Sequence, residues 1–438
     1  MEYESLWQGS THLPQFPVLK GDIKTDVLII GGGIAGILTA YFLHQKGVNY
    51  VLAEQNRICG GVTGNTTAKI TLQHGLIYHK ILKSRGMEIT KGYYEANKIA
   101  METYSRLCNT IDCDYTLKDN YVYSLNDSKK LFEELTALQK IGCNALFCKD
   151  LKLPINTQGA VCAPDQAQFH PLKFLSAISK DLNIYEQTKV REMVGNTAVT
   201  SCGKIIADNI VVTTHFPFIN KHGSYFLKLY QHRSYVLALR GAEEINGMYV
   251  DENDKGFSFR NYRDLLVVGG GGHRTGKKGG SFWQLKELKK EHFPDSNIVS
   301  SWATQDCMSL DSVPYIGKYS AATRNLYVAT GFNKWGMSSA MVAAQLLCDM
   351  LTGVENEFAQ VFNPSRSILK PQLFINGIES VTNLLTSTTK RCPHLGCALK
   401  WNRQEHSWDC PCHGSRFSED GKLINGPATD GIIKQEKQ

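Results

Sequence analysis

The chain lacks both a long uninterrupted hydrophobic segment and a compact apolar region near its start. The apolar stretch Val27–Leu43 holds 17 uncharged residues, but Gly31-Gly32-Gly33 and Gly36 interrupt it. Consecutive glycines favour a strand, a turn and a helix over one membrane-spanning helix. Residues 1–26 are polar and charged, unlike a secretory signal. We therefore expect a cytoplasmic protein with no membrane span.

A strong excess of one charge is also missing. The 48 basic and 41 acidic residues leave a net charge of +7 over 438 residues, and no five Lys or Arg residues are consecutive. Neither nucleic acid nor an acidic membrane surface is therefore indicated as a partner. A hydrophobic fraction of 42% is typical of a soluble globular protein, and the length predicts two or three domains.

Cysteine, in contrast, is plentiful, with thirteen residues. The pairs Cys108/Cys113 and Cys143/Cys148 hint at a metal site, but they lack C-x-x-C spacing and lie in helical patterns. We predict that these and the other cysteines outside the C-terminal region are buried free thiols.

Two short boxes near the C-terminus combine cysteine with histidine. They read Cys392-Pro393-His394-Leu395-Gly396-Cys397 and Cys410-Pro411-Cys412-His413-Gly414-Ser415. Each box supplies one thiolate and one imidazole, which together can bind a [2Fe-2S] cluster with two cysteines on one iron and two histidines on the other. The predicted ligands are Cys392, His394, Cys410 and His413. A structural zinc ion would use the same atoms, although zinc fingers pair Cys with Cys and His with His.

The boxes resemble those of the Rieske family. The resemblance implies a disulfide between Cys397 and Cys412 and a hydrogen bond from Ser415 to a bridging sulfide. Phe417 stands where high-potential members have tyrosine, which predicts a potential below the top of the Rieske range. Gly426-Pro427-Ala428 resembles the proline loop that shields the cluster.

A dinucleotide fingerprint lies near the N-terminus. Thr25–Ile30 reads as a buried strand, Gly31-Gly32-Gly33-Ile34-Ala35-Gly36 follows it, and Ile37–Gln45 continues as an apolar helix. A second strand, Val48–Ala53, ends at Glu54. In this G-x-G-x-x-G context the first glycine permits the turn, the second admits the pyrophosphate and the third allows close helix packing. The helix N-terminus faces the pyrophosphate and the acidic residue faces a ribose.

The fingerprint by itself does not distinguish FAD from NAD. A second glycine-rich strand, Leu265–Arg274, is followed by Lys277-Lys278-Gly279-Gly280 where an apolar helix should begin. We therefore predict no separate nicotinamide site there.

The first ~360 residues resemble the family of D-amino-acid oxidase, glycine oxidase and sarcosine oxidase. Besides the fingerprint, the similar segments are Thr63–Lys69, Ile210–Thr214, Pro314–Gly317 and Leu326–Met337. The resemblance implies an α/β fold, with an FAD-binding Rossmann-like domain of glutathione-reductase type and an inserted mixed-sheet substrate domain. It adds these FAD-binding residues to the fingerprint: Thr63, Thr66, Thr67, Lys69, Gly331, Lys334, Trp335, Gly336 and Met337.

Lys69 differs from the histidine that anchors flavin covalently in some relatives, so we predict noncovalent FAD. Lys69 and Lys334 are either positive charges near the flavin or ordinary surface lysines. On the strands expected within 226–275, substrate-facing candidates are His232, Arg233, Arg260 and Tyr262, with Lys334 as a further catalytic candidate. An arginine there could bind a substrate carboxylate bidentately, or be merely exposed.

The predicted domain division has three parts. An FAD-dependent oxidoreductase spans 1–360, with FAD-binding parts at about 22–80, 155–215 and 300–355 and substrate-domain parts at about 81–154 and 216–299. A linker and helix span 361–387, and a truncated all-β Rieske domain spans 388–438. The strands that normally precede the first box have no room here. Such a small unit can bury little apolar surface of its own, so we expect it to pack against the flavin domain.

These features together predict an FAD-dependent oxidoreductase. It would oxidise a small amine, amino acid or hydroxy acid and pass electrons from flavin through the cluster to an unidentified acceptor. Two alternatives remain open from sequence. An external donor could feed a flavin reductase or monooxygenase through the cluster, or the chain could be a redox-sensing electron carrier without its own substrate.

Overall fold

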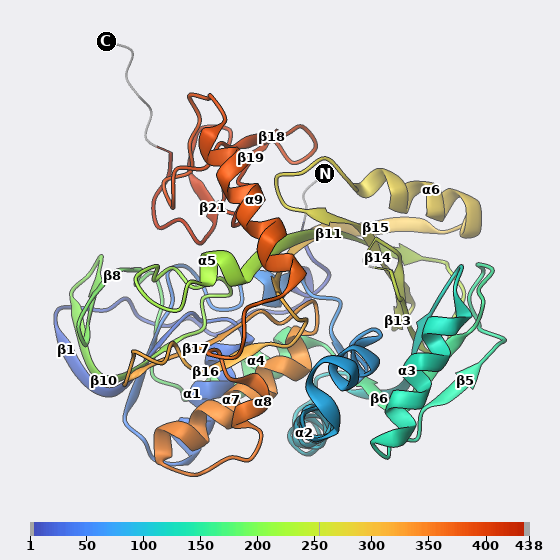
Figure 1. The fold of residues 1–438 in the computed structure, drawn as a ribbon, viewed down its shortest axis with the longest axis horizontal. Helices are drawn as coiled ribbons and strands as arrows, with labels where there is room; N and C mark the ends of the chain where they lie inside the picture. Colours follow the sequence, from blue (N-terminus) through green and yellow to red (C-terminus); the bar gives the residue numbers. More distant parts are fainter. Residues whose placement is uncertain (1–3, 254, 433–438) are drawn as a thin grey trace.

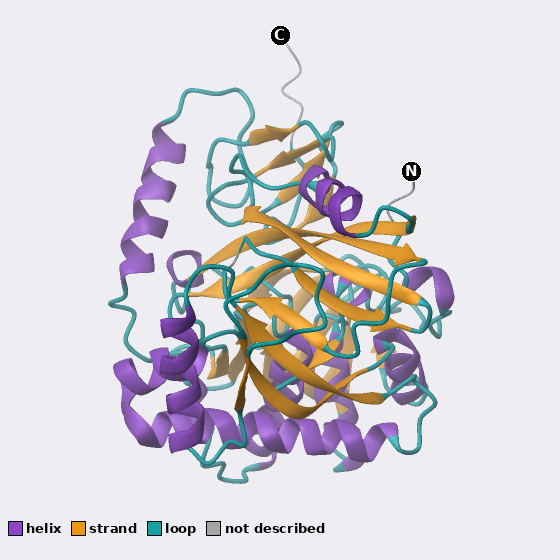
Figure 2. Cartoon of the chain, turned by 90° about the vertical axis from the view of Figure 1, so that its right-hand side faces the viewer, coloured by secondary structure: helices purple, strands orange, loops and turns teal. Residues whose placement is uncertain are grey.

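The computed structural model describes residues 4–253 and 255–432. Two large sheets form the body of the molecule, and a small third sheet lies above them beside helix α9 (Figures 1 and 2). This arrangement confirms the predicted α/β fold with a mixed-sheet second region and a small all-β C-terminal domain. The exact domain boundaries stay predictions, and residues 1–3, 254 and 433–438 lie outside the described chain.

The first sheet carries the fingerprint. Its order is β16 (Tyr315–Lys318), β17 (Leu326–Thr330), β10 (Lys204–Val212), β1 (Ile23–Ile30), β2 (Tyr50–Ala53) and β7 (Ile184–Tyr185), while β8 (Val190–Val194) and β9 (Thr197–Thr200) extend it beside β10. Strand β1 pairs in parallel with both β2 and β10. The carboxyl ends of these three strands therefore meet at one edge, where an open α/β sheet binds its ligand.

Helices cover this sheet because their sequences are apolar almost all round. Helix α1 (Ile34–Gln45) packs against α7 (Gly336–Thr352), and both are largely buried. The short helices α4 (Pro171–Ser179) and α8 (Ala359–Phe362) complete the layer. Helix α7 thus begins at the end of the Leu326–Met337 segment.

The second sheet has nine strands. Its order is β15 (Asn297–Ser309), β11 (Leu229–Arg240), β14 (Leu265–Arg274), β13 (Ser258–Tyr262), β12 (Met248–Asp251), β4 (Thr116–Tyr123), β6 (Ala160–Gln168) and β3 (Lys69–Ile70), with β5 (Leu146–Cys148) paired to β6. The strands predicted in 226–275 are confirmed. Helices α2 (Ile77–Cys108, kinked at Gly86) and α3 (Ser128–Lys140) occupy most of the first predicted substrate-domain part. Helix α6 (Phe282–His292) follows β14.

The C-terminal domain has one antiparallel sheet of four short strands. They are β18 (Lys400–Asn402), β19 (Ser407–Asp409), β20 (Arg416–Ser418) and β21 (Leu423–Asn425). Helix α9 (Pro371–Leu385) directly precedes the first box, as its periodicity predicted. Among the described residues, no named strand lies between β17 and the first box. The short helix α5 (Tyr225–Lys228) and the 3-10 turns η1 (Gln8–Ser10) and η2 (Val62–Asn65) complete the elements.

Candidate flavin cavity and cluster site

A cavity of about 600 Å³ begins at the carboxyl ends of β1, β2 and β10 and extends beneath the second sheet. Nearly all predicted FAD-binding residues line it. They are Gly31, Gly33, Ile34, Ala35, Glu54, Thr63, Thr66, Thr67, Lys69, Gly331, Lys334, Trp335, Gly336 and Met337. The fold therefore gathers four segments that are far apart in sequence around one space.

The glycines of the fingerprint leave room that side chains would fill. At Gly31, with φ of +112°, a Cβ atom would lie 2.8 Å from the carbonyl oxygen of Thr213. At Gly36 it would lie 2.0 Å from the carbonyl oxygen of Gly31, which explains why Gly36 supports the turn from below rather than lining the cavity. Thr63 Oγ1 accepts a 3.0 Å hydrogen bond from the Ile34 N–H at the start of α1. This cradle fits a pyrophosphate at a helix N-terminus.

Glu54 lies at the end of β2, where the fingerprint places the ribose acceptor. Its carboxylate accepts hydrogen bonds from the N–H groups of Gly32 (2.7 Å) and Asn56 (2.8 Å). Burial raises the pKa of Glu54, while these N–H groups act in the opposite direction. The acid is thus held rigidly at the cavity wall.

Two lysines line the other end of the cavity. Lys69 is buried, and desolvation together with the neighbouring Arg260 lowers its pKa to about 7. Lys334 lies in a left-handed turn just before α7, with φ of +72°. Both lysines line the cavity, and Lys334 is half-buried.

Several residues that line the cavity were not predicted from the sequence. Asp306 on β15 lies near Lys334, and burial raises its pKa to about 6 against the influence of Lys334 and Arg233. His74 stacks on the Trp335 ring at 5.1 Å and bonds through Nε2 to Ser338 Oγ at 2.8 Å. Burial lowers the pKa of His74 to about 3, so the ring is neutral. No motif marks these residues, because only strand register and helix packing bring them here.

The predicted substrate-facing residues on the strands do not line this cavity. Arg260 is fully buried and donates to the carbonyl oxygen of Ala68 at 2.9 Å. Tyr262 donates to Asp114 at 2.7 Å. Arg233 forms an ion pair with Glu405 of the C-terminal domain, and His232 is buried on the same strand. Of the catalytic candidates, only Lys334 borders the space where a substrate would bind.

The four predicted cluster ligands converge between the two boxes. The Nδ1 atoms of His394 and His413 lie 3.3 Å apart, and the Cys392 and Cys410 thiols are in hydrogen-bonding contact. Hydrogen bonds from neighbouring thiols lower the pKa of Cys410 well below its usual value. A thiolate is the form that binds iron. Ser415 is buried, contacts Cys392 and accepts a 3.0 Å bond from the Ala428 N–H.

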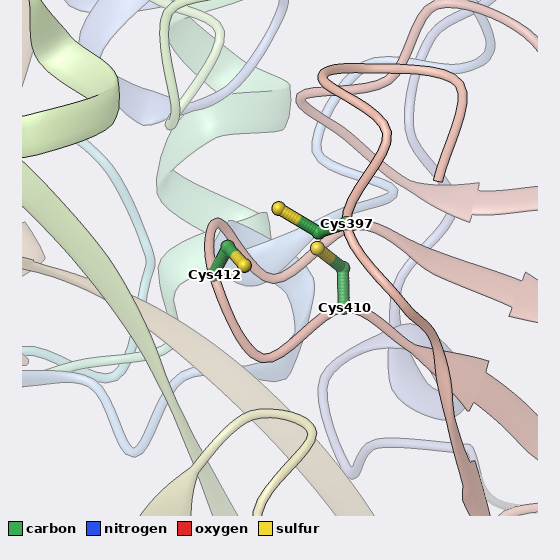
Figure 3. Close-up of side chains that lie close together, drawn as sticks. All are labelled: Cys397, Cys410 and Cys412. Carbon is green, nitrogen blue, oxygen red and sulfur yellow. The ribbon is translucent and has the colours of Figure 1, made fainter. Parts of the chain in front are cut away.

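The predicted disulfide between Cys397 and Cys412 is not formed. Among the described residues every cysteine is a free thiol, as predicted outside the boxes, but Cys148 and Cys202 are half-buried rather than buried, and Cys148 lies on strand β5 rather than in a helix. The sulfurs of Cys397, Cys410 and Cys412 lie within 4.8 Å of one another and point toward a common centre (Figure 3). A disulfide requires an S–S distance of about 2.05 Å. Here the Cys397 and Cys412 sulfurs are not bonded to each other, and the Cys410 sulfur lies within 4.8 Å of both.

The cluster boxes pack directly against the second sheet, which confirms the expected docking. Gln231 on β11 donates through Nε2 to the carbonyl oxygen of His413 at 2.9 Å. Gln305 on β15 donates to Gln231 Oε1 at 2.6 Å and to the Gly414 carbonyl oxygen at 2.8 Å. Both glutamines also line the cavity, so one layer of side chains separates it from the second box.

The histidine end of the cluster site faces the flavin cavity. Phe216 lines the cavity, and its ring centroid is 6.4 Å from the His394 ring and 6.0 Å from the His413 ring. Asn220 Oδ1 lies 2.9 Å from His394 Nε2. The proline loop, at residues 424–429, forms part of the cavity wall itself.

The chain matches the family model for FAD dependent oxidoreductases over residues 26–350 and that for the Rieske [2Fe-2S] domain over residues 371–435. It belongs to the FAD-dependent oxidoreductase family and carries a C-terminal Rieske domain. Its cofactors are accordingly FAD and a [2Fe-2S] cluster, whose ligand set favours iron over zinc at the two boxes.

Two curated relatives and one solved structure illustrate the similarity. The chain is 35% identical to the "Putative Rieske 2Fe-2S iron-sulfur protein YhfW" of Bacillus subtilis (strain 168), over 99% of this chain and 97% of that protein. It is 23% identical to the gamma-glutamylputrescine oxidoreductase of Escherichia coli (strain K12), over 78% and 87%. The glycine oxidase structure from Geobacillus kaustophilus superposes with a TM-score of 0.67 at 17% identity, covering 79% of this chain and 99% of that one.

No helix among the described residues is both long enough and apolar enough to cross a membrane.

Proposed function

We propose that the protein oxidises a small amine, amino acid or hydroxy acid and delivers the electrons through the Rieske cluster to an unidentified acceptor. Bound FAD supplies the two-electron oxidation and can release its electrons singly to an iron–sulfur centre. The observation that carries the proposal is the shared wall. Fingerprint residues and the proline loop of the cluster domain line one cavity. Two cofactor sites that share a wall suit direct electron transfer.

Different residues of the cavity would bind different parts of the cofactor. Gly31 and Gly33 leave space for the pyrophosphate, Gly36 allows the helix to pack close to the turn, and Glu54 accepts hydrogen bonds from a ribose. The N-terminus of α7, beginning at Gly336, directs N–H groups toward the cavity, where negative charge is stabilised. Lys69 takes the place of a covalent anchor, which supports noncovalent binding of FAD.

Asp306 is our candidate for binding the substrate. Its carboxylate borders the cavity next to Lys334, and the pKa of about 6 leaves it ionised at neutral pH. An amine substrate could donate hydrogen bonds to it. Arg233 and Arg260 are bonded elsewhere, so neither supplies the bidentate partner that a substrate carboxylate would need. The Asp306 carboxylate therefore suits the amino group that amines and amino acids share.

The test is an anaerobic titration of purified protein with a panel of amines, amino acids and hydroxy acids. Flavin absorbance and the EPR signal of the reduced cluster are followed together. We expect an amine to bleach the flavin and the Rieske signal to grow afterwards. The Cys410→Ser variant, which loses a cluster ligand, should bleach without developing that signal. Flavin that stays oxidised with every substrate, while an external donor reduces the cluster first, would contradict the proposed direction.

A further inference from the structure

Helix α9 presents its apolar face to solvent and its polar face to the protein. Asn376 and Asn383 are 1% and 3% exposed. On the opposite side the apolar stripe, defined as Phe374, Ile378, Val381 and Leu385, is 57% to 81% exposed. A helix on the surface of a globular protein normally has the reverse orientation. Figure 2 shows α9 as the upright helix at the left edge of the molecule.

Specific hydrogen bonds hold the helix in this orientation. Asn376 donates to the carbonyl oxygen of Leu227 at 3.0 Å and accepts from Arg274 at 2.9 Å. Glu379, on the same side of the helix, pairs with Lys277 at 2.6 Å. Rotating α9 to bury the stripe would break these hydrogen bonds and the ion pair between Glu379 and Lys277. The outward position of the stripe is therefore built into the packing.

The charges around the stripe are almost all positive. Lys370 precedes the helix, and Lys390 and Arg391 follow it. Within 369–395 the single acidic residue is Glu379, which is engaged with Lys277. Arg391 also bonds the carbonyl oxygens of Leu384 and Thr386, which fixes its charge at the C-terminal end of α9. Apolar side chains bordered by cations complement an anionic lipid surface.

We propose that α9 docks the protein on an anionic lipid bilayer, with the apolar stripe inserted at the level of the headgroups. A 15-residue helix lies in the interface rather than crossing it, which agrees with the absence of a spanning helix among described residues. The sequence had not indicated an acidic membrane surface, because it has no run of five or more Lys or Arg residues and only folding turns the apolar stripe outward.

Two other occupants fit less well. If two α9 helices from separate copies paired, cations would face each other in the parallel and in the antiparallel orientation, because both ends of the helix are basic. One helix stripe would also bury far less than the roughly 1,200 Å² of a stable interface. Binding hot spots between proteins are enriched in Trp, Tyr and Arg, and the stripe contains none of these.

Docking would bring the cluster domain close to the lipid surface. Leu395, in the first box next to the ligand His394, is 38% exposed. The Cys412 sulfur lies 3.9 Å from the carbonyl oxygen of Glu379 on α9. The buried side of α9 thus contacts the loop that holds the second pair of predicted ligands.

The experiment is co-sedimentation of the full-length holoprotein with vesicles of phosphatidylcholine alone or mixed with phosphatidylglycerol. We expect binding to the mixed vesicles that weakens with added salt. Replacing two stripe residues, Phe374→Ser with Ile378→Ser, should reduce the partition coefficient at least about tenfold. The matched control is Leu146→Ser with Val194→Ser, on β5 and β8. These side chains are 58% and 59% exposed, and strands β5 and β8 lie on opposite sides of the molecule (Figure 1).

The control should bind vesicles as the unaltered protein does. Circular dichroism and the flavin spectrum check that both double variants are folded. Failure to bind either vesicle type would overturn the proposal, as would unchanged binding of the stripe variant. A dimer in sedimentation velocity that the stripe variant abolishes, without vesicle binding, would assign the stripe to self-association instead.

Discussion

The flavin region and the cluster region of this protein are stabilised in different ways. The flavin region has an extensive apolar core between its sheets and helices, with side chains such as Ile29, Leu38 and Trp302 fully buried. The core cluster of the C-terminal domain has seven buried residues, and four of them are cysteines. Ordinary burial of apolar surface can fold the first region. The second region depends on its metal site and on the surface where it docks.

The docking surface is mainly polar. Glu405 accepts hydrogen bonds from both Arg233 on β11 and Arg416 on β20, and from Tyr235 at 3.1 Å. Gln231 and Gln305 add bonds to the backbone of the second box. Such an interface aligns two sites geometrically but adds little apolar area.

Removal of a cluster ligand should unfold the cluster region and leave the flavin region intact. In Cys410→Ser we expect no Rieske EPR signal and loss of ordered structure in residues 388–432, because the thiolates and imidazoles form the centre of that domain. FAD content should stay near one per chain. Hydrogen exchange with EPR and flavin absorbance measures both outcomes. Cys348→Ser, which alters a buried thiol on α7, is the control and should keep the cluster.

Loss of the charge on Glu405 should loosen the docked domain while leaving both cofactors bound. Glu405→Gln removes one partner of a buried ion pair, which costs about 3–5 kcal/mol when no other group compensates. Arg416 retains Asp409, so we expect the lower part of that range. Faster hydrogen exchange in β18–β21 and slower reduction of the cluster by flavin would report it. Asp420→Asn, an exposed acid in the same domain, should change neither.

The same carboxylate predicts a pH dependence. Arg233 and Arg416 overcome the effect of burial and lower the pKa of Glu405 to about 2. An unfolded glutamate titrates near ~4.3, so the stabilisation is complete above that pH and is lost as pH falls toward 2. Thermal unfolding of the C-terminal domain should therefore shift downward between about pH 5 and pH 3 in the wild type. A Glu405→Gln variant with an equally large shift would assign the effect to other acids.

Close contact at the second box can be tested with a pair of glycines. Gly414 and Gly396 both have positive φ, +79° and +78°. A Cβ at Gly414 would lie 2.6 Å from Cβ of Gln231 across the interface, whereas at Gly396 the nearest atom is 3.7 Å away. Gly396→Ala should cost roughly 1–2 kcal/mol from backbone strain alone. Gly414→Ala should cost more and should also slow electron transfer between the centres, measured by stopped-flow absorbance.

The smallest effect is expected within the flavin region. Burial and Arg260 lower the pKa of Lys69 to about 7, so its charge is lost as pH rises through 7. The midpoint potential of the flavin should then depend on pH with an inflection near 7, because a cation stabilises the anionic reduced form. Lys69→Met should abolish the inflection without changing the cluster potential. Spectroelectrochemical titration between about pH 6 and pH 9 gives both potentials.

Local sequence determined the chemistry of both cofactors. The run of glycines after a buried strand, followed by an apolar helix and Glu54, specifies a dinucleotide cradle because its geometry depends on consecutive residues. The two boxes likewise bring Cys392, His394, Cys410 and His413 together by short spacing. The strands within 226–275 and the helix preceding the first box also followed from periodicity.

Only the tertiary structure decided how these parts meet. Asp306 and His74 reach the cavity through sheet register and helix packing, and Arg233 is directed to Glu405, which lies 172 residues away. The disulfide implied by family resemblance is not formed, because the positions of three sulfurs depend on how two loops fold. The outward stripe of α9 could not be inferred from its periodicity. An amphipathic pattern states that one face is apolar, but the neighbours of the helix determine which face is buried.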